Sequence, residues 1–156
     1  TIGYFFFYAP PVPVSKGGGV FIQVRNPVAG LNDSQAIAGF NEMYIRYLLA
    51  TIKANILHNP PFSSNTPKLN FYIENETYSA TVENGLVKVS RGLITGEDIR
   101  IRTTRIECVK MLKDPAAIQV SFSSGESSVE PVAGKLSLAS KGYLQLYETL
   151  TGKKFL

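Results

Sequence analysis

The chain contains little of what most catalytic and metal-binding sites require. Its 156 residues include one cysteine (Cys108), one histidine (His58) and no tryptophan. A disulfide within the chain is therefore excluded, as is a structural zinc site built from cysteines and histidines. No Gly-x-Ser-x-Gly elbow, phosphate-binding loop or calcium-binding spacing of acids occurs. We accordingly expect no catalytic residue, no cofactor and no metal.

The composition is that of a folded domain with a core. Hydrophobic residues make up 44% of the chain and charged residues 18%, and the net charge is +4. The basic cluster around Arg100, Arg102 and Arg105 lacks the interleaved aromatics of a single-strand nucleic-acid platform. Acidic neighbours such as Glu97 balance it, so we interpret it as a solvated sheet face and expect no nucleic-acid partner.

Residues 1–19 form a separate N-terminal segment rich in aromatics, proline and glycine. Its aromatic run consists of Tyr4, Phe5, Phe6, Phe7 and Tyr8. The whole segment 2–8 has seven residues, too few to cross a bilayer, which takes about 20. Two hypotheses stay open. The run is either the interfacial end of a hydrophobic span preceding Thr1, or a β-strand packed on the domain or exchanged with a neighbouring subunit.

The remainder, residues 20–156, is predicted to be one α+β domain. Apolar residues at spacings of three and four predict an amphipathic helix over 33–57. The period-two alternation that follows predicts an antiparallel meander with one face exposed to solvent. Residues 116–122 fit either helix or strand, and 123–128 is interpreted as a loop. The other predicted elements are strands at 20–24, 69–74, 77–82, 86–90, 98–103 and 134–138, and helices at 104–112 and 141–150. This order indicates a mostly antiparallel sheet packed on one side by helices.

The stretch from Leu69 to Leu156 resembles sterol carrier protein 2-like (SCP2-like) domains. The matching pieces are a hairpin pair at 71–73 and 86–89, an acidic-headed strand at 98–101, a short helix ending at Met111-Leu112, and Gly134-Lys135-Leu136-Ser137-Leu138 before the terminal helix. The segment 113–131 is longer than the usual link, and the N-terminal segment has no counterpart. The resemblance implies a non-catalytic module that holds an acyl chain or sterol between sheet and helices.

The resemblance also implies which side chains line the ligand site. The candidates are inward residues of the predicted last strand, Leu136 and Leu138, and of the terminal helix, Leu144 and Tyr147. The expected partner is a lipid or another apolar ligand, with the module held near a membrane. The alternative function is a structural subunit of an envelope complex or extracellular filament, joined through residues 2–8. Two glycosylation sequons, at Asn32 and Asn75, are compatible with an extracytoplasmic location.

Overall fold

The structure is a computed structural model that describes residues 12–16 and 20–154. The aromatic run at 4–8, predicted to contact a membrane or a sister subunit, lies outside these residues. The strands are β1 (Val12–Lys16), β2 (Val20–Val24), β3 (Lys68–Ile73), β4 (Glu76–Glu83), β5 (Leu86–Arg91), β6 (Ile99–Thr103) and β7 (Ser128–Pro131). The helices are α1 (Asp33–Ala38), α2 (Glu42–Thr51), η2 (Ala54–Ile56), α3 (Arg105–Lys113), α4 (Ala116–Ser124), α5 (Lys135–Lys141) and α6 (Tyr143–Thr151).

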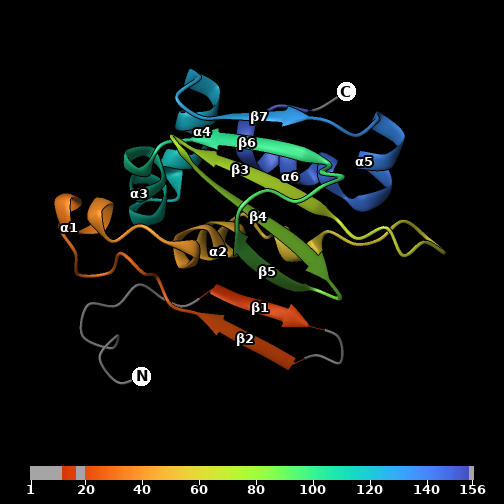
Figure 1. The fold of residues 1–156 in the computed structure, drawn as a ribbon, viewed down its shortest axis with the longest axis horizontal. Coiled ribbons are helices and arrows are strands. Elements are labelled where there is room, and N and C mark those ends of the chain that lie inside the picture. The colour runs from red at the N-terminus through yellow and green to blue at the C-terminus, as the bar shows by residue number, and fades with distance from the viewer. Residues whose placement is uncertain (1–11, 17–19, 155–156) are drawn as a thin grey trace.

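The main sheet has the strand order β5-β4-β3-β6-β7 (Figure 1). The β3–β4, β4–β5 and β6–β7 pairs are antiparallel, and the β3–β6 pair is parallel. The predicted α+β class is therefore confirmed. The predicted simple meander is wrong in one respect, because β6 pairs with β3 and not with its sequence neighbour β5.

A polar clamp holds the connection that makes this crossover. Residues 92–98 pass across the open face of the sheet (Figure 1), above β3. There the Asn70 side chain accepts from the Ile94 N–H at 2.8 Å and donates to the Ile94 carbonyl at 2.9 Å and to Glu97 Oε2 at 2.6 Å. Asn70 is thus buried on the face that alternation assigns to solvent.

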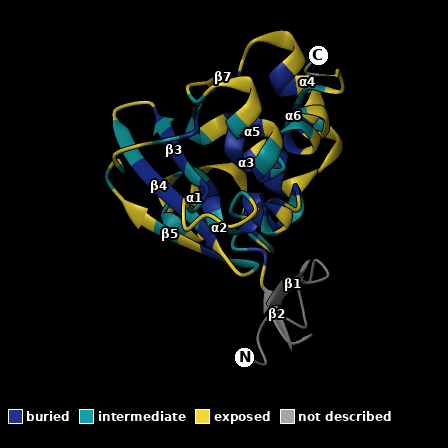
Figure 2. Cartoon of the chain, turned by 90° about the vertical axis from the view of Figure 1, so that its right-hand side faces the viewer, coloured by how far each residue is buried: buried dark blue, intermediate teal, exposed yellow. Residues whose placement is uncertain are grey.

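The opposite face of the sheet is the apolar one, and helices cover it. Leu69, Phe71 and Ile73 of β3 alternate toward this face and are almost fully buried (Figure 2). Tyr78, Ala80 and Val82 of β4 and Ile99 and Ile101 of β6 are buried in the same way. Helices on one face and polar side chains on the other are the layers that the sequence pattern predicts.

The helix predicted over 33–57 is interrupted. Helix α1 ends at Gly39, and Asn41 begins α2 by accepting the Met43 N–H on its side chain at 2.8 Å. A further break follows at Lys53, whose φ of 61° separates α2 from η2. Asparagine is a strong N-cap, so a new helix begins inside a continuous apolar period.

Residues 113–138 also differ from the prediction. The ambiguous 116–122 stretch is helical as α4, and the predicted loop at 123–128 ends in an edge strand, β7. The predicted strand at 134–138 is wrong: these residues begin helix α5, with Gly134 as N-cap. Leucines two apart fit a strand, but this window is too short for the period to decide.

The β1–β2 hairpin lies beside α2 and β5 at one edge of the molecule (Figure 1). Its strands pair antiparallel from Val12 with Val24 to Lys16 with Val20. Strand β1 belongs to the predicted N-terminal segment and β2 to the predicted domain.

Candidate functional site

A small apolar cavity lies between the β6–β7 edge of the sheet and helices α5 and α6. Three sheet residues, one from α5 and five from α6 line it: Ile99, Val129, Pro131, Leu138, Tyr143, Leu144, Leu146, Tyr147 and Leu150. Its volume is about 10 Å³, enough for about one water molecule. As it stands, the cavity has no room for an acyl chain.

The two helices reach the cavity through a tight glycine junction. Gly142 has a φ of 93°, which ends α5 and starts α6 without an intervening loop. Leu138, in the middle of α5, therefore faces the same space as the buried stripe of Tyr143, Leu146 and Leu150 on α6. A spacing of three and four residues places this stripe on one side of the helix.

Three of the four predicted lining residues come together here. Leu138, Leu144 and Tyr147 all line the cavity. Leu136 does not: its side chain is 88% exposed. The expectation that it points inward is wrong, because the 134–138 stretch is helical and two residues along a helix face different directions. Contact of the other three with a ligand stays a prediction.

The sheet side of the cavity was missed in the sequence analysis. Val129 and Pro131 belong to β7, a four-residue edge strand that starts at the last residue of the predicted loop 123–128 and was not itself predicted. Ile99 lies in the predicted strand 98–103, but its position beside α6 depends on the β6–β7 pairing. No local signal in the sequence places β7 beside β6.

Asp98 ties α5 and α6 to the sheet beside the cavity. Its Oδ1 accepts from Lys141 Nζ at 2.8 Å, and its Oδ2 accepts from the Tyr143 hydroxyl at 2.9 Å and from the Lys68 N–H at 2.8 Å. Its backbone carbonyl accepts from the N–H groups of Val132 and Ala133. Asp98 therefore holds α5 at both ends, through Lys141 at its last residue and through Val132 and Ala133 just before its first.

This anchor is fully inside the protein. The Lys141 and Asp98 side chains are 1% and 4% exposed. Burial, together with the neighbouring Asp98 carboxylate, raises the pKa of Tyr143, so its hydroxyl stays a hydrogen-bond donor. Removing one partner of a buried ion pair of this kind strongly destabilises a protein, because the other charge then stays buried without a partner.

A second buried polar chain links α3, α4 and β6. Glu107 accepts from the Ser121 hydroxyl at 2.8 Å, Ser121 and Ser127 lie 2.6 Å apart, and Ser127 meets Thr103 at 2.7 Å. The Ser121 hydrogen bond, with help from Lys110, lowers the pKa of Glu107. Every buried side-chain nitrogen and oxygen in the described part of the chain has a hydrogen-bond partner.

The residues considered for catalysis lie apart from the cavity. Cys108 is fully buried on α3, and burial raises the pKa of its thiol to about 12. His58 is exposed, with its Nδ1 at 2.8 Å from the Asn59 carbonyl. Within residues 12–16 and 20–154, no three acidic, cysteine or histidine side chains gather as metal ligands would.

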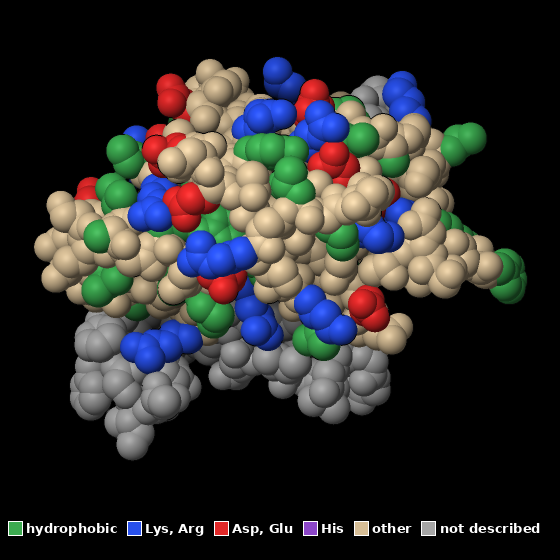
Figure 3. Space-filling model, in the orientation of Figure 1, with side chains coloured by type: hydrophobic (Ala, Val, Ile, Leu, Met, Phe, Trp, Pro, Cys, Tyr) green, Lys and Arg blue, Asp and Glu red, His purple; other side chains and the backbone are tan. Residues whose placement is uncertain are grey.

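The basic cluster is dispersed into separate contacts. Arg100 pairs with Glu97 at 2.8 Å, Arg105 pairs with Glu76 at 2.6 Å, and Arg102 lies over the Tyr72 ring at 4.4 Å. Figure 3 shows basic and acidic side chains interspersed on this side of the molecule. The arrangement gives no concentrated positive surface on the described part of the sheet.

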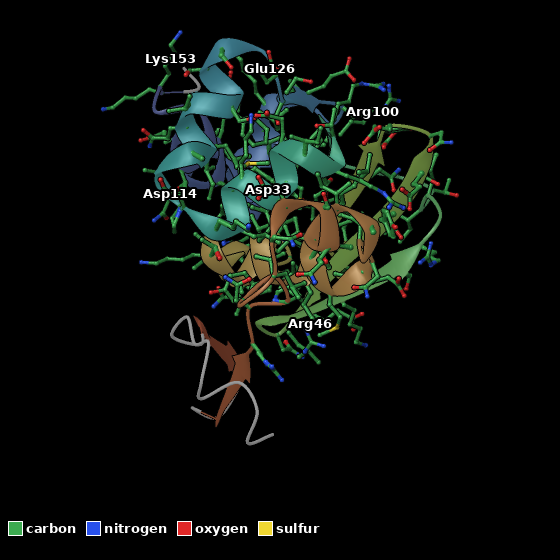
Figure 4. All side chains as sticks on the ribbon, turned by 90° about the vertical axis from the view of Figure 1, so that its left-hand side faces the viewer. Asp33, Arg46, Arg100, Asp114, Glu126 and Lys153 are labelled. Atoms are coloured by element: carbon green, nitrogen blue, oxygen red, sulfur yellow. The ribbon has the colours of Figure 1, made fainter. Side chains whose placement is uncertain are left out.

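A shallow groove of about 400 Å³, lined by both polar and apolar residues, lies between α2 and β5 at the other edge of the sheet. Glu42, Met43 and Arg46 line it from the helix, and residues 86–89 line it from the strand. Figure 4 shows Arg46 at this edge. The groove is open and mixed in character, so the apolar cavity is the better candidate for an apolar ligand.

Comparison with known proteins finds similarity only among solved structures. No family model matches the chain. No curated protein matches it either. A stereoselective inverting sec-alkylsulfatase from a Pseudomonas species has a TM-score of 0.45 at 14% identity, over 85% of this chain and 19% of that one. The chain therefore spans about a fifth of the length of that enzyme.

Two SCP2 structures match over nearly their whole length. The SCP2 domain of the ubiquinone synthesis protein UbiJ has a TM-score of 0.40 and 14% identity, covering 74% of this chain and 96% of its own. A sterol carrier protein 2-like protein from Aedes aegypti has a TM-score of 0.36 and 16% identity, covering 64% and 93%. SCP2 domains, which residues 69–156 resemble in sequence, are thus among the solved structures to which this chain is similar. In the described part of this chain, no helix is long and apolar enough to cross a membrane.

Proposed function

We propose that this chain binds an apolar ligand of the acyl-chain class between α5–α6 and the β6–β7 edge of the sheet. The observation that carries the proposal is the cavity itself, whose lining is leucine, isoleucine, valine, proline and tyrosine from three separate parts of the fold. The Tyr143 hydroxyl in this lining is already engaged by Asp98. An apolar lining of this kind favours an apolar guest.

Uptake requires the helices to separate from the sheet, because about 10 Å³ holds only one water. Helix α5 is short, has no side-chain N-cap and is bounded by Gly134 and Gly142. A chain inserted beneath it would gain about 0.8 kcal/mol for each buried methylene. That gain has to offset the packing that Leu138 gives up when it moves away from the β6–β7 edge, together with any loss of the buried Lys141–Asp98 pair at the end of α5.

The absence of tryptophan allows a direct test with a single reporter. Tyr147→Trp places an indole in the cavity wall, and Leu93→Trp places a matched one on an exposed loop. Each variant is titrated with a brominated fatty acid, which quenches tryptophan on contact. We expect saturable quenching of Tyr147→Trp and only weak, linear quenching of Leu93→Trp.

Two results would overturn the proposal. One is equal quenching at both positions, which would indicate non-specific adsorption. The other is no quenching at Tyr147→Trp while the variant remains folded by circular dichroism. Native mass spectrometry of the purified chain adds an independent readout, with co-purified lipid as the expected result.

A further inference from the structure

One end of the molecule carries two large apolar side chains that contact almost nothing. Phe62 is 111% exposed and Leu136 is 88% exposed, the highest values among the large hydrophobic residues described. Phe62 belongs to the η2–β3 connection (residues 57–67), and Leu136 belongs to α5. These two segments lie at the same end of the molecule (Figure 1), and the His58 N–H donates to the Lys141 carbonyl between them at 3.1 Å.

The fold itself gives no reason for phenylalanine at position 62. The Ser63 N–H donates to the Pro60 carbonyl at 3.1 Å, which closes a turn with Phe62 in its third position. Phe62 has a φ of 59°, a region that favours glycine and is a true outlier for a bulky side chain. The residue thus carries backbone strain and an exposed ring with no compensating contact.

Leu136 presents the same feature on a helix. It lies less than one turn from Leu138, which is 2% exposed and faces the cavity, so α5 has an outward and an inward leucine. Three of the seven residues of α5 are exposed, Leu136 among them, whereas Leu138 and Lys141 are buried. Figure 2 faces this end of the molecule. Figure 3 shows isolated hydrophobic side chains protruding here, with no apolar groove around them.

Residues 57–67 carry no lysine, arginine or acidic residue, and the charged residues of α5 are both lysines. Lys141 is buried and pairs with Asp98, so Lys135 is the exposed lysine of this helix. The sequence has no acidic residue from 43 to 73 and none from 131 to 147. Lys135 adjoins Leu136, and Lys68 lies at the base of the connection. The Lys68 ammonium donates to the Thr66 carbonyl at 3.0 Å and to Asn65 Oδ1 at 3.5 Å, and neither partner is a carboxylate.

We infer that this end of the molecule docks on an anionic lipid bilayer, with Phe62 and Leu136 inserted among the lipids and the lysines near the head groups. Single protruding side chains suit a bilayer, which accepts them without a matching pocket, and aromatic residues favour its interface. A protein partner would need about 1,000 Å² of complementary surface. The inference does not depend on ligand uptake by the cavity.

The test again uses a tryptophan that the chain otherwise lacks. Phe62→Trp is mixed with vesicles of equal parts phosphatidylglycerol and phosphatidylcholine, and with phosphatidylcholine alone. We expect a blue shift of the emission with the anionic vesicles, and quenching when the lipids carry bromine on their acyl chains. Leu93→Trp, on a different surface, serves as control and should show neither effect.

Serine substitutions measure the contribution of each side chain to binding. Phe62→Ser and Leu136→Ser should each weaken vesicle co-sedimentation about tenfold, since burying one such side chain contributes about the free energy of one decade in affinity. Ile106→Ser is the matched control: Ile106 is 52% exposed on α3, at the opposite end of the molecule in Figure 1. It should bind like the unchanged protein.

Vesicle binding without any change in the emission of the Phe62→Trp variant would overturn the inference, because another surface would then make the contact. Phe62-dependent dimers without vesicles would also overturn it, by assigning these side chains to a second copy. Quenching of Tyr147→Trp by free fatty acid is measured without vesicles. Its failure would remove the proposed function and leave the membrane contact standing.

Discussion

Phe62 has an unfavourable backbone conformation and a fully exposed side chain, and two substitutions separate the effects of these two features on stability. Phe62→Gly relieves the strain at φ 59° and removes only a ring that packs on nothing. We expect the free energy of unfolding to rise by about 0.5–1 kcal/mol. Phe62→Ala keeps the Cβ atom and therefore most of the strain, so its stability should stay close to that of the unchanged protein. A loss of stability in the glycine variant, measured by urea unfolding, would show that the ring makes stabilising contacts.

The lowered pKa of Glu107 makes the free energy of unfolding depend on pH. Its pKa is lowered mainly by the Ser121 hydrogen bond, so the unfolded chain takes up this proton at a higher pH than the folded protein. The stabilisation is complete above pH of about 4.3 and is lost as the pH falls through the lower, folded-state pKa. Ser121→Ala should destabilise the protein by about 1.5 kcal/mol at neutral pH, and by less in acid.

Urea unfolding at a series of pH values checks this dependence. Ser123→Ala, an exposed position on the same helix, is the control and should follow the unchanged protein throughout. A difference between Ser121→Ala and the unchanged protein that stays constant from neutral pH into acid would show that the hydroxyl acts without affecting the Glu107 proton.

At the level of elements, the sequence predicted best where a local rule decides alone. Strands β3, β4 and β5 follow from period-two alternation, and Asn84-Gly85 marks the turn between the last two, where both residues have positive φ. Helix boundaries were less predictable. The apolar period runs through Gly39 and Asn41, yet the capping side chain of Asn41 starts a second helix there. The apolar period predicts one continuous helix and the capping residue predicts a break, and the structure follows the capping residue.

The glycine junction between α5 and α6 gives a prediction at this scale. A Cβ added to Gly142 would meet its nearest neighbour, His58 Nε2, at 3.7 Å, an ordinary contact. Gly142→Ala should therefore cost only the left-handed backbone penalty, about 1–2 kcal/mol of unfolding free energy. Gly134→Ala, at a negative φ with open space around it, carries no left-handed penalty and should change stability by less than Gly142→Ala does. Equal effects in thermal or urea unfolding would contradict this assignment.

At the level of the whole molecule, the strand order was not predictable from local patterns. No local pattern in β6 predicts that it pairs with β3. The crossover depends on hydrogen bonds from Asn70 to Ile94 and Glu97, which are 24 and 27 positions away in the sequence. The candidate site shows the same limit. Leu144 and Tyr147 of α6 were predicted as lining residues, but the three buried α6 residues that also line the cavity, Tyr143, Leu146 and Leu150, were not. The sheet residues depend on the β6–β7 pairing. Long-range pairing was decisive in both cases.

Cys108 provides a probe of the whole molecule, because it is the only thiol and is 0% exposed in the core. Burial raises its pKa to about 12, so the thiolate that reacts with an alkylating reagent is scarce in the native state. Modification should require unfolding and run about a thousandfold or more slower than in the unfolded chain. Its rate should rise with urea in parallel with global unfolding. Ser123→Cys in a Cys108→Ala background should react at once, since position 123 is exposed. Rapid modification of Cys108 without urea would instead show that α3 opens locally, independently of the sheet.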